Sequence, residues 1–350
     1  TIDSLNMAVN TSAGGTVTAD FNVTAGDVSI GTGSGTAINM ANAAGSRTTV
    51  SNLTLEGGNV TVTGNIIRTG GAGSETATIT LDGSNLDMSG NSVGSSGAQI
   101  MMQASSGTLT NLAQLNDGGT LTKDTVGTLT LGNGNTFTGG VNIAGGTLLA
   151  NNTTGSATGS GPVSVDVGAI LGGDGIIAPT SGESIIVDGD LMVGMSGATG
   201  GADLALTTTG VGSTILNGKV GFDIFSGAGA GDNTAVLGAA DLLVLSGPVT
   251  LGGTLAIGDP NSLSAWASGD KWRLFDWALS GAPTGTFTNL TGPVGNFTDL
   301  PDLSTYSLAW DVSDIYLGGT ISVITVPEPG RLVLVVMGVL GLVLRRRRRV

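Results

Sequence analysis

The sequence contains neither cysteine nor histidine among its 350 residues. Without cysteine, the chain has no disulfide framework and no thiolate nucleophile. Without histidine as well, a Cys/His zinc site and a histidine-based catalytic triad are excluded. These two absences remove several of the commonest routes to enzymatic or metal-dependent chemistry.

Charged residues are scarce, at 11% against about 25% in ordinary domains, and aromatic residues make up only 4%. The lack of Glu/Lys/Leu heptads excludes a coiled coil or a helical bundle. Glycine is abundant, with 62 residues, but it does not recur at every third position, which excludes collagen. Because 40% of the residues are hydrophobic, simple disorder is disfavoured. The composition predicts a β protein with glycine-rich turns.

Positive charge is concentrated at one end of the chain. Six of the 12 lysines and arginines are Arg331 and 345–349, whereas all 26 acidic residues precede Arg331. Residues 1–330 therefore carry a net charge of −20, and the last 20 residues carry +6. Such an acidic body repels nucleic acid, so we expect no DNA or RNA partner. The first residues lack a basic stretch followed by an apolar run, so we expect that a secretory signal was removed or was never included here.

The segment 327–350 joins a Pro-Glu-Pro start, an apolar run and a cluster of arginines. The apolar run, 332–344, has 13 residues; as a helix it would span about 20 Å of a ~30 Å hydrocarbon core. Arg331 and the cluster would help it span by reaching opposite interfaces, with the cluster cytoplasmic and the body outside. A buried core helix and a basic tail for nucleic acid are the weaker alternatives, because five arginines and an acidic body oppose them.

This segment resembles the PEP-CTERM sorting signal of bacterial proteins associated with exopolysaccharide. The three elements stand in the order that the family shows. The resemblance implies recognition and cleavage near Pro-Glu-Pro by a membrane enzyme of the exosortase type, followed by release or attachment at the cell surface. The residues that would form the sorting signal are Pro327, Glu328, Pro329, Arg345, Arg346, Arg347, Arg348 and Arg349.

An internal repeat organises the body of the chain. Residues 53–65 (LTLEGGNVTVTGN) match residues 79–91 (ITLDGSNLDMSGN) at an offset of 26 positions. Apolar and polar residues alternate within each copy, which is typical of strands with one buried face. A Gly-Thr-Leu or Gly-Thr-Ile triplet also recurs, beginning at Gly107, Gly119, Gly127, Gly146, Gly253 and Gly319.

Repeats of this length, made only of short strands and glycine turns, predict a solenoid in which each coil stacks on the previous one. Allowing ~22–26 residues per coil and ~4.8 Å between strands, we expect a rod about 60 Å long. Small residues suit its narrow core, and Asn or Thr ladders suit its surface. A β-sandwich, which also uses short strands, is the alternative.

Residues 119–177 carry a second resemblance. Their Gly-Thr-Leu triplets, the Asn135–Val141 segment NTFTGGV and the closing Leu171–Gly175 segment LGGDG are similar to the autotransporter-associated β-strand repeat (the passenger-associated transport repeat). That family forms part of a right-handed parallel β-helix in secreted passengers. The resemblance therefore implies the same architecture for this segment.

Aromatic residues are concentrated in 241–323, which suggests a β module that covers the end of the solenoid and prevents edge pairing there. We expect the indoles to fill the core of this cap. A carbohydrate-binding platform, with indoles stacked on sugars, is the alternative. The residues concerned are Trp266, Trp272, Trp277, Trp310, Tyr306 and Tyr316.

Three patterns resemble chemical sites only weakly. Asp188 and Asp190 would share one face of a strand, as an acid–base or calcium-binding pair, but a solvated face or turn is the expected reading. The segment 227–232 (GAGAGD) resembles one unit of a calcium-binding repeat, yet occurs once, so a turn is expected. The glycines in 31–35 (GTGSG) precede no helical pattern, which argues against a dinucleotide site.

Together these features predict an all-β chain: a right-handed parallel β-helix, or solenoid, with a C-terminal β cap and a short C-terminal hydrophobic helix. The expected organisation is N-terminal solenoid coils in 1–118, the autotransporter-associated repeat in 119–177, further coils in 178–240, the aromatic cap in 241–323 and the sorting signal in 324–350.

The expected function is that of a non-catalytic, exported surface or extracellular-matrix protein. It would be an acidic rod, associated with exopolysaccharide or biofilm and adhesive through many weak contacts. We expect no catalytic, cofactor-binding or metal-binding residues. The expected partners are an exosortase-type processing enzyme, extracellular polysaccharide and, transiently, the inner membrane through the C-terminal segment. A β-helix polysaccharide hydrolase or lyase is the alternative.

Overall fold

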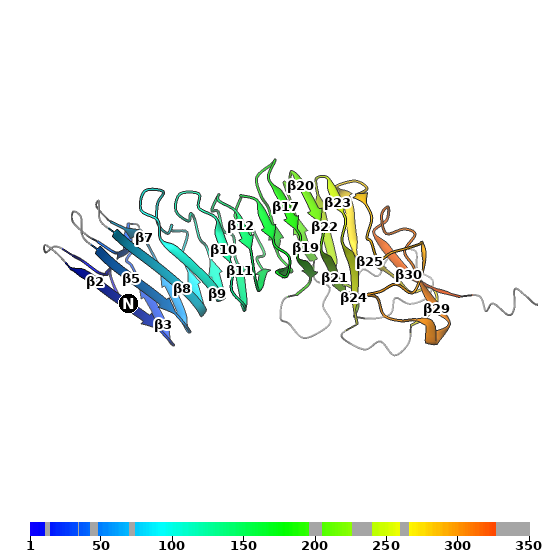
Figure 1. Cartoon of the computed structure of the whole chain (residues 1–350), viewed down its shortest axis with the longest axis horizontal. Helices are drawn as coiled ribbons and strands as arrows, with labels where there is room; N and C mark the ends of the chain where they lie inside the picture. Colours follow the sequence, from blue (N-terminus) through cyan, green and yellow to red (C-terminus); the bar gives the residue numbers. More distant parts are fainter. Residues whose placement is uncertain are drawn as a thin grey trace, which may run out of the picture.

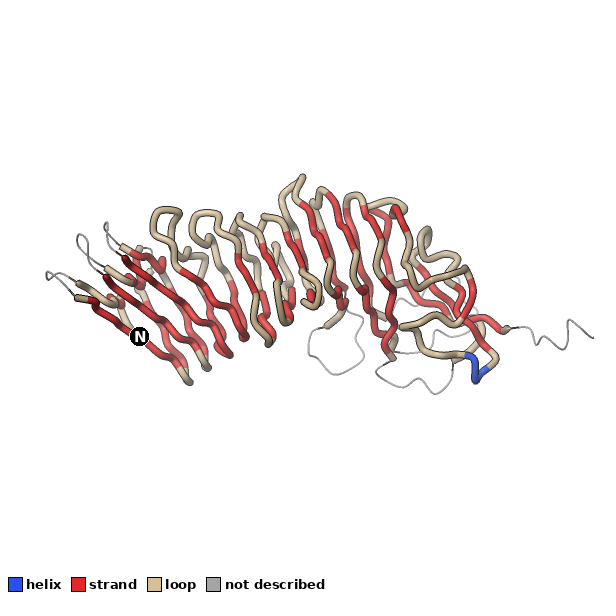
Figure 2. The backbone as a smooth tube through the Cα atoms, in the orientation of Figure 1, coloured by secondary structure: helices blue, strands red, loops and turns tan. Residues whose placement is uncertain are grey.

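The computed structural model describes residues 1–10, 15–33, 35–42, 48–69, 74–195, 205–225, 240–259 and 266–326. These residues form an elongated rod, in which the strands follow one another along the long axis in sequence order (Figures 1 and 2).

The described residues form strands, turns and one 3₁₀ turn, η1 (Ser304–Tyr306), so the predicted all-β class is confirmed. Among them, no helix has the length and apolar character needed to cross a bilayer. The predicted sorting signal and hydrophobic helix, 327–350, lie outside the described residues.

The largest sheet of the described part has 12 strands, and its pairs are parallel. β3 pairs with β6, and β6 with β8, beside the main path of the sheet. The strands are β2 (Thr16–Val23), β3 (Asp27–Ile30), β5 (Thr48–Leu55), β6 (Asn59–Val62), β8 (Ser74–Asp87), β9 (Met101–Thr110), β11 (Thr128–Gly132), β13 (Thr147–Ala150), β15 (Ile170–Gly173), β18 (Asp190–Val193), β21 (Lys219–Asp223) and β24 (Thr254–Gly258).

Three further parallel sheets accompany it within the described ranges. One contains β1 (Leu5–Asn6), β4 (Thr36–Met40) and β7 (Asn65–Arg68). The second contains β10 (Leu121–Lys123), β12 (Val141–Ile143), β14 (Val163–Val165), β17 (Ser184–Val187), β20 (Ser213–Leu216), β23 (Val249–Leu251) and β27 (Thr284–Gly285). The third contains β16 (Ile176–Ile177), β19 (Ala205–Thr208), β22 (Leu242–Ser246) and β26 (Phe275–Leu279).

The chain visits these sheets in a repeating order. From β14 to β24 it passes in turn through the seven-stranded, the 12-stranded and the four-stranded parallel sheet, three strands at a time, among the described residues. We call one such pass through the three sheets a coil. Each strand pairs with its counterpart in the next coil. Parallel pairing of this kind is at odds with the antiparallel sheets of the sandwich alternative.

The strand register confirms the 26-residue repeat. Leu53 of β5 lies beside Ile79 of β8, and Asn59 of β6 lies beside Asn85. The recurring triplets do not all occupy equivalent positions, because Gly107 aligns with Leu129 and not with Gly127.

Coil length also varies more than the ~22–26 residues expected. Thr128 pairs with Thr147, 19 residues later, whereas Lys219 pairs with Thr254, 35 residues later. Longer coils keep the strand spacing and place the extra residues in the connections between strands, which tolerate added length.

Aliphatic columns fill the interior. In the 12-stranded sheet, successive coils place Leu129, Leu148, Leu171, Leu191 and Val220 side by side, and each is at most 4% exposed. A fully buried leucine contributes about 1.5–3 kcal/mol to stability. Because one coil cannot bury such a row alone, stacking of coils is what stabilises the fold.

An antiparallel sheet lies at the C-terminal end of the described rod, beyond β24 (Figure 1). Its strands are β25 (Lys271–Arg273), β30 (Thr320–Thr325), β29 (Leu308–Asp311) and β28 (Val294–Gly295). The predicted cap region 241–323 therefore contains both this sheet and the last strands of the parallel sheets.

The tryptophans lie in the core of this end, as the cap interpretation predicts. Trp310 is fully buried, and Trp266 and Trp272 pack against it with ring centroids 5.3 and 5.8 Å away. The fourth, Trp277, is 5% exposed and stacks on Phe275. The alternative of a sugar-stacking tryptophan platform is therefore wrong, because the indole faces are covered.

Candidate functional site

Polar ladders run along the outside of the N-terminal half. The Asn85 amide donates to the Asn59 amide oxygen at 2.8 Å, and Asn59 donates to the Asp27 carboxylate at 2.7 Å. A parallel ladder joins Asn52 to Asp20 at 2.7 Å. Each ladder links one coil to the next and holds exposed polar groups in a row at the strand spacing of ~4.8 Å. The predicted Asn ladders are confirmed.

Asp188 and Asp190 do not share the face of one strand, so the solvated turn that we expected is confirmed and the acid–base or calcium-binding pair is not formed. Asp188 lies after β17, Asp190 begins β18, and Gly189 lies at the corner between two sheets. Each carboxylate has its own partner on the next coil. Asn217 donates its amide to Asp188 at 2.8 Å, and the Lys219 ammonium lies 2.9 Å from Asp190. Both contacts connect coils as the ladders do.

The remaining weak patterns are a possible metal site and the glycine-rich segments 31–35 and 227–232. In the described residues, no group of three Asp, Glu, His or Cys side chains is placed to hold a metal ion. The strand β4 follows the glycines in 31–35, so the expectation that no helix follows them is confirmed. The GAGAGD segment, 227–232, lies outside the described residues.

Basic side chains in the described part are either paired with carboxylates or buried. Lys219 pairs with Asp190 as above, and Lys123 is fully buried. Surface pairs of this kind contribute little to stability, but they leave unpaired acidic groups to dominate the exposed surface. Such a surface repels polyanions. The remaining pairs are Arg68–Glu75 (3.4 Å), Lys271–Asp314 (3.7 Å) and Arg273–Asp276 (2.7 Å).

Lys123 is a lysine buried in the interior, and no sequence pattern predicted its burial. Its ammonium is held by backbone oxygens at a corner of the rod: it donates to the carbonyl of Thr125 and, at 3.3 Å, to that of Gly145. Burial lowers the pKa of Lys123 from its ordinary value of 10.5, and the nearby Asp124 carboxylate opposes that shift. The ammonium thus connects one coil to the next from inside.

Lys123 gives the stability of the protein a defined pH dependence. Because its pKa is lower in the folded chain than in the unfolded chain, the unfolded state binds the proton more tightly between the folded pKa and 10.5. We expect the wild type to gain stability relative to Lys123→Met as pH rises through that window. Urea unfolding of both proteins at several alkaline pH values measures this. Lys219→Met, which removes a lysine whose side chain is 40% exposed, controls for loss of a positive charge. A constant difference between wild type and Lys123→Met would contradict the expectation.

Comparison of the chain with models of known protein families gives no match. Comparison with curated protein sequences gives none either. The two resemblances noted in the sequence therefore rest on the residues that carry them.

Proposed function

We propose that the protein is a non-catalytic, exported component of the bacterial surface or extracellular matrix. Its body is a closed, right-handed parallel β-helix, and it associates with exopolysaccharide. The observation that carries this proposal is the order in which the chain visits its parallel sheets, returning to each one a strand farther along, with polar ladders outside. Right-handed crossovers join about 98% of parallel strand pairs in one sheet, which supports the handedness.

The rod offers a long surface on which many weak contacts can act together. Exposed amide and carboxylate ladders run along its N-terminal half, and hydroxyl-rich polymers hydrogen-bond to such groups. Weak sites that act in parallel give high avidity without a deep pocket. The separate partners of Asp188 and Asp190 favour this binding role over hydrolysis or lysis of polysaccharide.

The C-terminal segment supplies the proposed route to the surface. Pro327, Glu328 and Pro329 mark the site near which an exosortase-type enzyme would cut, and the apolar run with its arginines would hold the chain in the inner membrane until then. The mature rod would then reside at the cell surface or outside the cell.

Fractionation of the producing cells tests the proposal. We expect the full chain in the matrix and medium, shortened at its C-terminus, and a chain lacking 327–350 retained inside. Cytoplasmic retention of both would contradict the sorting role. Matrix polysaccharide incubated with the purified protein should keep its chain length; shortening that Asp190→Asn abolishes would identify a hydrolase or lyase instead.

A further inference from the structure

The C-terminal end of the rod contains a pocket, which we call the cap pocket. Its volume is about 250 Å³, and it is partly open to solvent. It lies between the loop that follows β27 and the loop that follows β29. Its main lining side chains are Thr286, Leu290, Pro293, Val312, Ser313 and Tyr316.

The lining combines an apolar wall with hydroxyl groups and contains no charged side chain. Leu290, Pro293 and Val312 form the apolar part, whereas Ser313 and Tyr316 bring hydroxyls. In the described part of the chain, neither the Ser313 hydroxyl nor the proton of the Tyr316 hydroxyl takes part in a hydrogen bond to protein. Both are therefore available to a ligand. A charged ligand would find no counter-charge here and would lose its hydration.

The Tyr316 ring is held in place before any ligand arrives. Its hydroxyl accepts a hydrogen bond from the Phe287 backbone N–H at 3.0 Å, and the two rings stack with centroids 6.3 Å apart. The indole of Trp277 on β26 donates to the Ile315 carbonyl at 2.8 Å, which anchors the residue before Tyr316. A wall fixed in this way loses little conformational freedom on binding.

Burial raises the pKa of the Tyr316 hydroxyl, while the hydrogen bond from the Phe287 N–H opposes that shift. The hydroxyl therefore keeps its proton at neutral pH and remains a donor. The pocket thus presents a hydroxyl donor, an aromatic side chain and an apolar wall at fixed positions.

We propose that the cap pocket binds one neutral sugar unit, at an end or branch of a polysaccharide chain. A pyranose ring has an apolar C–H face and a rim of hydroxyls, which matches the apolar wall and the hydroxyl donors of this pocket. The volume admits a single ring and not an extended chain. This inference rests on the proposed function and adds a defined, saturable site to the weak contacts along the rod.

The matched variants are Ser313→Trp, which fills the pocket from an exposed position, and Thr305→Trp, which adds the same side chain at an exposed residue of η1 outside the pocket. A third variant, Tyr316→Phe, keeps the ring and its stacking on Phe287 but removes the hydroxyl, both as a donor to the ligand and as the acceptor of the Phe287 N–H. The probes are cellotetraose, maltotetraose and mannotetraose as neutral sugars, tetragalacturonate and tetraglucosamine as charged ones, and 1-hexanol as an apolar one. Calorimetric titration of the full chain gives the affinities.

We expect at least one neutral tetrasaccharide to bind wild type and Thr305→Trp equally, and to bind Ser313→Trp and Tyr316→Phe at least tenfold more weakly. Equal affinity of all four proteins would overturn the proposal, as would preference for charged probes or hexanol. If no sugar binds but the protein still fractionates with matrix, the pocket proposal alone is overturned. If the protein is absent from the matrix, the proposed function itself is overturned.

Discussion

Replacing Asn135 with alanine is expected to lower the free energy of unfolding by about 2–6 kcal/mol, since two buried backbone groups lose their partners at about 1–3 kcal/mol each. Asn135 is 3% exposed. Its side-chain oxygen accepts from the Leu112 N–H at 2.8 Å, and its amide donates to the Ala157 carbonyl at 2.8 Å. One side chain thus bridges the coils on either side of its own.

Urea unfolding followed by far-ultraviolet circular dichroism measures this loss. Asn85→Ala is the matched control, because Asn85 is exposed and makes its side-chain hydrogen bond to Asn59 at the surface. The control should change stability by less than about 0.5 kcal/mol. Equal effects of the two substitutions would show that the buried bridge contributes nothing beyond a surface ladder.

Gly218→Ala is expected to destabilise the protein by about 3 kcal/mol or more, at the upper end of overpacking effects. A Cβ at Gly218 would lie 1.7 Å from the Gly189 carbonyl oxygen, and one at Gly253 would lie 1.6 Å from the Gly218 oxygen. These three glycines stack at one corner, where successive backbones approach closely. The backbone has little room to move, because the Gly218 N–H donates to the Val187 carbonyl.

Gly97→Ala provides the comparison for Gly218→Ala. A Cβ at Gly97 meets no atom within 4 Å, and its backbone does not require glycine. Circular dichroism and yield of folded protein should be near wild type for Gly97→Ala and strongly reduced for Gly218→Ala. A Gly218→Ala protein as stable as the control would mean that the corner can open.

The sequence predicted the fold where side-chain identity repeats at a fixed interval. The match of Leu53 with Ile79 and of Asn59 with Asn85 specified both the strands and their register. Prediction was poorer where coil length changes. The triplet alone does not reveal how many residues lie in the connection between two strands. It therefore did not predict that Gly107 aligns with Leu129 and not with Gly127.

Candidate sites were harder to predict than strands. Asp188 and Asp190 looked like a pair because two residues on a strand share a face, but Gly189 lets the chain turn a corner between them. Lys123 lies at an inward position of the alternating pattern of β10, although lysine side chains are seldom fully buried. One backbone oxygen that binds it, that of Thr125, is only two residues away, but the other, that of Gly145, belongs to the next coil and is not revealed by any local pattern.

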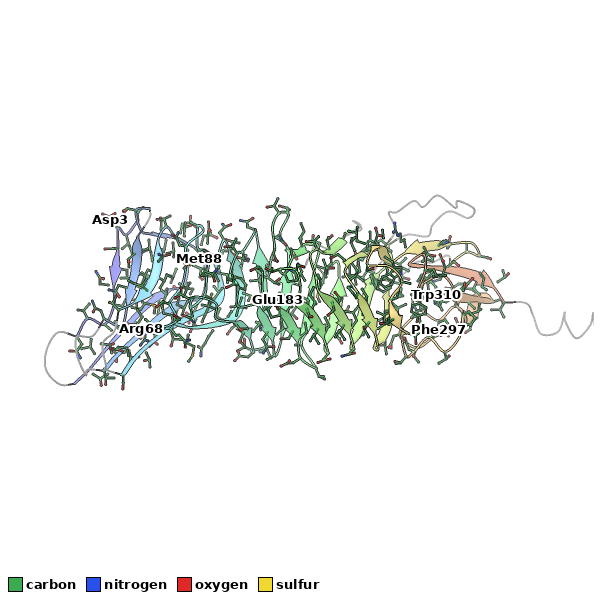
Figure 3. The ribbon with its side chains drawn as sticks, turned by 90° about the horizontal axis from the view of Figure 1, so that it is seen from above. Asp3, Arg68, Met88, Glu183, Phe297 and Trp310 are labelled. Atoms are coloured by element: carbon green, nitrogen blue, oxygen red, sulfur yellow. The ribbon has the colours of Figure 1, made fainter. Side chains whose placement is uncertain are left out.

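The placement of Arg68 and Trp310 near opposite ends of the rod is visible from above (Figure 3). All four tryptophans belong to the cap end, whereas most of the backbone that absorbs in the far ultraviolet belongs to the parallel sheets. Tryptophan fluorescence therefore reports the unfolding of the cap end and does not report the unfolding of the N-terminal end. In a fold whose units contact only their neighbours, one end can unfold before the other. The melting curves followed by tryptophan fluorescence and by circular dichroism then need not coincide. The difference between their midpoints measures how much of the rod unfolds as one cooperative unit.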